Sequence, residues 1–165
     1  MSIMVANIPT GAWSLWYHSP KENKWTTATY KHVAGVNNWE EFWTLIDLIG
    51  DDAFLNGFFF FMKGSTPPRW ENKANIRGGS YSMRVNRKDA FDGFMRYVIG
   101  AMLGKASYNP ENHMNGITIS PKRGFNIINV WNEDFKFSAL EDLREYGRRL
   151  PGEEIRYTRH IDKKF

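Results

Sequence analysis

The sequence predicts an α+β fold in which an antiparallel sheet of about seven or eight strands packs three helices against one face. Short strand-like segments outnumber helical ones, and they come in neighbouring pairs along the chain. Both features are typical of antiparallel sheets. The helical segments show apolar stripes, which a sheet is suited to cover.

Seven segments have the alternation or the composition of strands. In the first, Trp13, Leu15 and Tyr17 share one face. The fifth and sixth are joined by the basic turn at 121–124, as in a hairpin. The expected strands are 12–18, 26–33, 58–62, 80–85, 116–120, 125–131 and 154–158.

Three helices are expected, each with a terminal signal. Glu41 lies three residues after Asn38, close to a capping box, and Glu141 stands in the same relation to Ser138. Gly104 follows the second apolar stripe, where a left-handed C-terminal cap belongs. The helices are therefore predicted from residue 38, over 88–103, and from residue 138 to just before Pro151.

The length of 165 residues suits a single domain with a sizeable core. We expect residues 1–11, which are small and polar, to be a flexible segment, and residues 12–165 to be the domain. The absence of cysteine excludes disulfide scaffolds, iron–sulfur clusters and cysteine-based zinc sites. No apolar run is long enough for a membrane span and the start lacks a signal-peptide pattern, so the default expectation is a soluble intracellular protein.

Seven tryptophans exceed what a core of this size ordinarily uses. Trp25 and Trp70 lie in polar loop sequence, where they either fold back over the core or offer flat platforms to a ligand. Glu71 follows Trp70 directly, and a carboxylate can accept both donors on the Watson–Crick edge of guanine. A guanine methylated at N7 is cationic, so two indoles and a carboxylate suit it especially well.

A guanine nucleotide also carries phosphates, and basic residues are the candidates to hold them. The candidates are Lys122 and Arg123 in the hairpin turn and Lys163 and Lys164 in the tail. A lone basic turn is more often a solvated hairpin tip, and that reading stays open. The net charge of +4 is a mild basic excess, compatible with an anionic partner.

Five motifs, in order and at similar spacings, resemble those of the cap-binding translation initiation factor 4E family. The resemblance covers roughly residues 12–160. The motifs are WSLWY at 13–17, WEEFW at 39–43, PRWEN at 68–72, RGG at 77–79, and the strand 125–131 that ends in Trp131.

The resemblance implies a curved sheet with the helices on its convex face and a slot for the 7-methylguanosine cap of messenger RNA on its concave side. The implied roles are base stacking by Trp25 and Trp70, guanine-edge binding by Glu71, contact with the N7-methyl group by Trp131, and phosphate binding by Lys122, Arg123, Lys163 and Lys164. It implies no catalysis, no cofactor and no metal. We expect a monomer without membrane attachment, in the cytoplasm and also in the nucleus.

The first helix carries a second candidate surface. Trp43 falls at the edge of the apolar stripe, where it is either a rim residue or a partner anchor. In the family the matching tryptophan receives an amphipathic helix from a scaffold (an initiation factor 4G-like protein) or from a 4E-binding-protein-like repressor. Trp39, one turn earlier, is bulkier than in many relatives and would reshape that groove.

The sequence departs from the family at two phosphate-side positions. Residues 125–127 lack the usual basic residue, and Ser80 follows the RGG motif where a basic residue is common. The lead-in before Trp13 also differs from the family pattern. A translational repressor that binds the cap without recruiting the scaffold is therefore the alternative to an initiation factor, and a relative that has lost cap binding is a third reading. Enzymatic motifs are missing: the histidines are scattered, and neither a nucleophile elbow nor a phosphate loop occurs.

Overall fold

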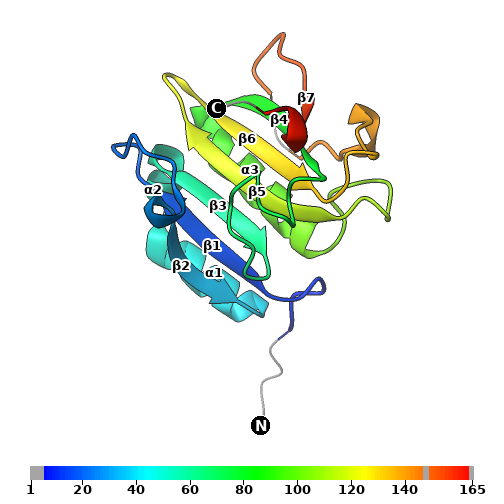
Figure 1. The fold of residues 1–165 in the computed structure, drawn as a ribbon. Coiled ribbons are helices and arrows are strands. Elements are labelled where there is room, and N and C mark those ends of the chain that lie inside the picture. Colours follow the sequence, from blue (N-terminus) through cyan, green and yellow to red (C-terminus); the bar gives the residue numbers. More distant parts are fainter. Residues whose placement is uncertain (1–5, 147–148, 164–165) are drawn as a thin grey trace.

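A computed structural model describes residues 6–146 and 149–163, which form one curved antiparallel sheet with helices on one face (Figure 1). The strand order is β2-β1-β3-β5-β6-β4-β7, and this architecture confirms the predicted fold class. The strands are β1 (Trp13–His18), β2 (Lys31–Val36), β3 (Phe58–Lys63), β4 (Gly79–Asn86), β5 (Met114–Pro121), β6 (Phe125–Asn132) and β7 (Arg156–Arg159). The helices are α1 (Trp39–Ile49), α2 (Asp51–Asn56) and α3 (Arg87–Met102).

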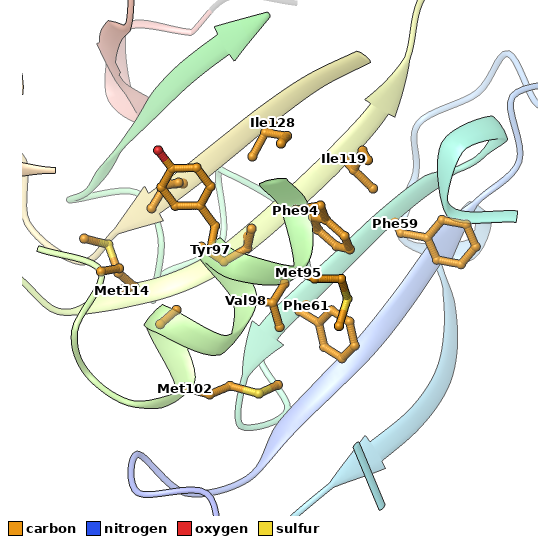
Figure 2. Packing of buried hydrophobic residues seen from close by; sticks show 14 of the residues in the cluster. Phe59, Phe61, Phe94, Met95, Tyr97, Val98, Met102, Met114, Ile119 and Ile128 are labelled. Carbon is orange, nitrogen blue, oxygen red and sulfur yellow. The ribbon is translucent and has the colours of Figure 1, made fainter. Parts of the chain in front are cut away.

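The main core lies between the sheet and the helices. Alternate strand residues such as Phe61, Ile119 and Ile128 face α3, where Phe94 and Val98 pack on them (Figure 2). All five side chains are fully or almost fully buried. This layer fixes the register of the strands, because a slip of one residue would turn every apolar side chain to the other face.

A smaller apolar cluster covers the opposite, concave face of the sheet. Phe60, Met62 and Trp131 are its buried members, and Trp16 and Trp70 are among the half-buried side chains packed on them. We call these residues the concave cluster. The concave cluster therefore places Trp70 and Trp131, both singled out from the sequence, on the same face of the sheet.

The predicted caps of α1 and α3 are present. The Asn38 side chain accepts a hydrogen bond from the Glu41 amide at 2.8 Å, while the Glu41 carboxylate accepts one from the Asn37 amide at 2.9 Å. Gly104 has a φ of +73°, the left-handed conformation expected of a residue that ends a helix.

Two predicted elements are wrong. Thr27–Thr29 form a 3₁₀ turn rather than strand, because the Thr29 hydroxyl bonds the Thr26 backbone at both its amide and its carbonyl. Of the helix expected from residue 138, the described residues form only the 3₁₀ turn Leu140–Asp142. Backbone groups there pair with a neighbouring segment instead, as when the Arg144 amide donates to the Ala106 carbonyl at 3.0 Å.

The structure has a helix that the sequence analysis did not separate from α1. This helix is α2. Gly50 has a φ of +82° and breaks the helical path. Asp51 and Asp52 then begin α2, where acidic side chains favour the N-terminal turn. The last strand also begins two residues later than expected, at Arg156.

The predicted domain boundary at residue 12 does not mark where packing begins. Ile8 is buried, its amide donates to the Asn37 carbonyl at 3.1 Å, and the Thr10 amide donates to the Met102 carbonyl at 3.2 Å. Residues 1–5 lie outside the described part of the chain. Within the described ranges no helix is both long and apolar enough to cross a membrane.

Candidate functional site

The loops that carry Trp25 and Trp70 meet around Tyr30. The rings of Trp25 and Tyr30 are 5.8 Å apart, and Tyr30 and Trp70 each pack against the concave cluster. The pKa of Tyr30 is raised to about 12, first by burial and then by the negative charge of Glu71. Trp25 and Glu71 therefore lie near the same tyrosine, and Trp70 packs on the cluster that this tyrosine also contacts.

Trp25 has one supported face and much exposed surface. Its indole stacks on the buried His18 ring with centroids 3.6 Å apart and planes 5° from parallel. His18 is fixed in turn, since its Nε2 lies 2.8 Å from the Lys24 carbonyl oxygen and 3.1 Å from the Thr29 hydroxyl. Trp25 is nevertheless 44% exposed, so the structure holds a flat aromatic ring rigidly at the surface.

Arg69 connects the two loops, a role that the sequence analysis missed. Its Nε forms an ion pair with Glu71 Oε1, and its Nη1 donates to the hydroxyl of Thr27, two residues after Trp25. The guanidinium thus holds the carboxylate and the neighbouring turn in one arrangement. The contact between Arg69 and Thr27 joins residues 42 positions apart in sequence, and no local pattern signals such a pair.

Trp131 lies at the other end of the concave cluster, beside the C-terminal tail. It is 5% exposed, and its ring meets His160 edge-on at 4.9 Å. Lys163 Nζ is 6.0 Å from the Trp131 ring centroid, and burial lowers the pKa of this lysine. One of the two predicted tail lysines therefore reaches the site, whereas Lys164 lies outside the described residues.

His160 fastens the tail to the site from within. Its Nδ1 donates to the Asn75 carbonyl at 2.7 Å, because a carbonyl oxygen can only accept, and its Nε2 then accepts from the Ser80 hydroxyl at 2.6 Å. Burial lowers the pKa of His160 to about 4, so the ring is neutral. Ser80, which stands where the family often has a basic residue, is thus engaged in holding this histidine.

Lys122 and Arg123 lie at the end of β6 that is opposite Trp131. They are exposed in the turn between β5 and β6, whereas Trp131 is near the opposite end of β6. Trp131 is six residues along β6 from Phe125, a distance of roughly 20 Å. The structure therefore does not place these two predicted phosphate ligands beside Trp131, and their role stays a prediction.

The second candidate surface is on α1, on the other side of the sheet. Trp43 is 46% exposed, and its ring meets the buried Phe42 edge-on at 5.1 Å. Trp39 is half-buried and packs on the other side of Phe42, with centroids 5.8 Å apart. Trp43 therefore has an exposed indole, whereas Trp39 is partly buried and packs against the core.

Other hollows and clusters do not compete with this site. A hollow of about 570 Å³ lies away from the concave cluster, between the segments of Tyr108, Leu140 and Glu154. It combines three glutamates with one arginine and has no convergent aromatic pair. Within the described ranges, no three histidine, aspartate or glutamate side chains converge as metal ligands would.

The structure is a single-sheet domain with aromatic and acidic side chains gathered on its concave side. A family model described as eukaryotic initiation factor 4E matches residues 10–164. The chain belongs to that family.

Relatives agree with this assignment. The eukaryotic translation initiation factor 4E of Candida albicans is 28% identical over 143 residues, which are 81% of this chain and 68% of that protein. The chain spans between 59% and 65% of the length of three further relatives of the same description.

Two solved structures show the same fold. Caenorhabditis elegans eIF4E-3, in complex with the 4E-binding protein Mextli, superposes with a TM-score of 0.77 at 16% identity over 96% of both chains. Ascaris suum eIF4E-3, solved with an m7G cap, has a TM-score of 0.71 at 20% identity over 82% of this chain and 77% of that one.

Proposed function

We propose that this protein binds the 7-methylguanosine cap of messenger RNA for translation initiation, without catalysis. The observation that carries the proposal is that Trp25 and Glu71 lie near Tyr30, and that Tyr30 and Trp70 pack on the same cluster. Two indoles and one carboxylate supply stacking faces and a double acceptor, which a cationic guanine uses together. The Ascaris suum relative with the same fold was solved with an m7G cap, which supports the proposal.

In the proposed complex the base inserts between Trp25 and Trp70. His18 supports Trp25 from behind, so little ordering of this ring is needed on binding. Glu71 accepts from N1–H and the N2 amino group of guanine, and Trp131 borders the N7-methyl group. Lys163, close to the Trp131 ring, is placed to meet the first phosphate.

The test compares 7-methyl-GTP with GTP in the parent protein and in Trp25→Ala and Trp70→Ala variants. Each variant should weaken binding of the methylated nucleotide more than that of GTP, because the cationic ring gains both stacking and cation–π attraction. Trp43→Ala is the matched control, since its indole is as exposed as that of Trp25 but lies on the helical side. Equal losses for both nucleotides would refute the sandwich.

We propose further that Trp43 receives an amphipathic helix from a scaffold or a 4E-binding protein. Its exposure beside Phe42 supports this, and the Caenorhabditis elegans relative was solved with a 4E-binding protein. Trp43→Ala should abolish binding of a peptide that carries such a helix while leaving cap affinity unchanged. Retained peptide binding would exclude this surface.

The repressor alternative rests on the altered lead-in before Trp13 and on the bulky Trp39, which packs on Phe42 next to the exposed Trp43. It is decided in a translation extract depleted of its own cap-binding factor. An initiation factor restores translation of capped messenger RNA when added, whereas a repressor lowers what remains.

A further inference from the structure

The sheet register places two arginines on the concave face beyond Trp131. Trp131 pairs with Ser80 of β4, and the next residues on the same face pair Asn129 with Ser82 and Ile127 with Arg84. Directly paired residues of an antiparallel ladder project from the same face, and alternate residues along each strand share it. Arg84 therefore lies on the face of Trp131, directly opposite Ile127.

Arg156 joins this face from the edge strand. It pairs with Ser82, between the level of Trp131 and the level of Arg84. Its neighbour Tyr157 packs against the main core at Tyr81, so Arg156 projects to the concave side. Both arginines are exposed. We call Arg84 and Arg156 the basic row.

The basic row leads from Trp131 toward the β5–β6 turn. Arg84 is four residues along β4 from the level of Trp131, which is about 13 Å. Its guanidinium lies over the Phe125 ring, 5.4 Å from the centroid, and so leans toward the turn that carries Lys122 and Arg123. Positively charged side chains therefore lie along the whole stretch of the sheet between Trp131 and that turn.

The basic row also stands beside the stretch in which β6 has no charge. Ile127 is apolar, and its direct cross-strand neighbour is Arg84. A charge on the neighbouring strand reaches the same space above the sheet as one on β6 would. The opposing charge is slight: Glu153 Oε1 is 3.6 Å from Arg84, in a pair that is partly exposed on both sides and therefore weak.

We propose that the basic row binds the phosphate chain and first phosphodiesters of a capped RNA whose base occupies the tryptophan site. The proposal rests on the proposed function, because it takes its direction from a base held near Trp131. A base stacked there does not reach Arg84, whereas its phosphates and the following nucleotide do. Arginine suits this role because its planar fork matches phosphate oxygens.

The experiment removes both charges in the full chain with Arg84→Met and Arg156→Met together. The probes are 7-methyl-GMP and a 7-methylguanosine-capped oligonucleotide of about ten residues. We expect at least a tenfold loss of affinity for the oligonucleotide and less than a twofold change for 7-methyl-GMP. The slope of log affinity against log salt should become shallower by about 1.4, or about 0.7 for each lost phosphate contact.

The matched control is Arg96→Met with Lys88→Met, which removes two exposed charges from α3 on the other side of the sheet. It should bind both probes as the parent does. If the double variant of the basic row binds the oligonucleotide no more weakly than this control, the basic row is wrong and cap binding stands. The opposite outcome has two parts: the parent does not prefer 7-methyl-GMP to GMP, and the double variant of the basic row still binds the oligonucleotide more weakly than the parent. In that case the proposed function fails and the basic row stands as a phosphate-binding surface.

Discussion

At the scale of single residues, the site depends on how Glu71 is held. Its carboxylate pairs with Arg69, and its charge also helps to raise the pKa of the nearby Tyr30. The same guanidinium reaches Thr27 next to the Trp25 loop. Arg69 thus has two effects, ordering the carboxylate and offsetting part of its charge, and they are separable by experiment.

Glu71→Ala should remove most of the cap affinity while the fold survives. The change leaves two donors of the guanine edge unpaired in a partly desolvated site, which costs about 2–3 kcal/mol, or roughly 30- to 150-fold in dissociation constant. Calorimetric titration with 7-methyl-GTP measures it. Glu40→Ala, on the exposed face of α1, is the control. An unchanged constant for Glu71→Ala would remove the carboxylate from the site.

Arg69→Met should raise discrimination between 7-methyl-GTP and GTP. Removing the guanidinium leaves the full charge of Glu71 to attract the cationic base, by about 1 kcal/mol or a little more at an intermediate dielectric. The ratio of the two dissociation constants should therefore rise several-fold. The ratio is the informative quantity, since loosening of the loops lowers both affinities alike. An unchanged ratio would show that Arg69 acts by ordering the loops alone.

At the scale of elements, close backbone approach explains the two glycines of the RGG motif. A Cβ at Gly78 would lie 1.9 Å from the Asn132 carbonyl oxygen, and one at Gly79 would lie 2.4 Å from the Tyr157 ring. Because a backbone oxygen cannot move aside as a flexible side chain does, Gly78 fixes how closely the Trp70 loop joins the sheet below Trp131.

Gly78→Ala should therefore destabilise the protein by more than about 2 kcal/mol, in the range of overpacked cores. Denaturant unfolding measures the loss. Gly35→Ala in β2 is the matched control, because its Cβ would come no closer than 3.8 Å to any atom. Equal stability of the two variants would mean that the loop and β6 are less tightly joined than the structure shows.

The elements that the sequence predicted well are those with a strong local period or a defined cap. The buried run beginning at Phe58, the stripe of α3 ending at Gly104 and the cap at Asn38 all have such signals. The helix expected after Ser138 failed, because its backbone groups pair with residues 106–108, a contact distant in sequence. Competing long-range pairs of that kind are invisible to local patterns.

The residues of the candidate site also divide into those with a local sequence signal and those without one. Trp25, Trp70 and Glu71 were conspicuous because large aromatics and an acid stood in polar loops. Arg69 gave no such signal, since an arginine in a loop is ordinarily solvated. The arginines of the basic row were equally hidden, because only the pairing of strands places them on the concave face.

At the scale of the whole molecule, His160 links stability to pH. The pKa of this histidine is about 4 in the folded protein and 6.5 as the reference value. Between these values the unfolded chain binds a proton that the folded protein does not, so the free energy of unfolding falls as pH falls from 6.5 to 4. The loss approaches about 3 kcal/mol, at about 1.4 kcal/mol for each pH unit.

Chemical denaturation at pH 7 and pH 4.5 measures this contribution. In His160→Gln the titrating ring is gone, so the part of the pH dependence that it causes should disappear while that of the carboxylates remains. The variant should therefore lose less stability than the parent between the two pH values. Identical pH dependence in both proteins would contradict the claim that His160 is buried and stays neutral down to a pH of about 4.

The most direct test of the central claim is quenching of tryptophan fluorescence by 7-methyl-GTP and by GTP. A cationic base stacked between Trp25 and Trp70 should quench strongly and saturably, with GTP giving weak quenching at the same concentrations. Because seven tryptophans contribute to the signal, Trp25→Phe and Trp70→Phe should each reduce the amplitude, whereas Trp43→Phe should leave the ligand-dependent change intact. Equal quenching by both nucleotides, or quenching that survives both substitutions, would contradict a cap site formed by these two tryptophans.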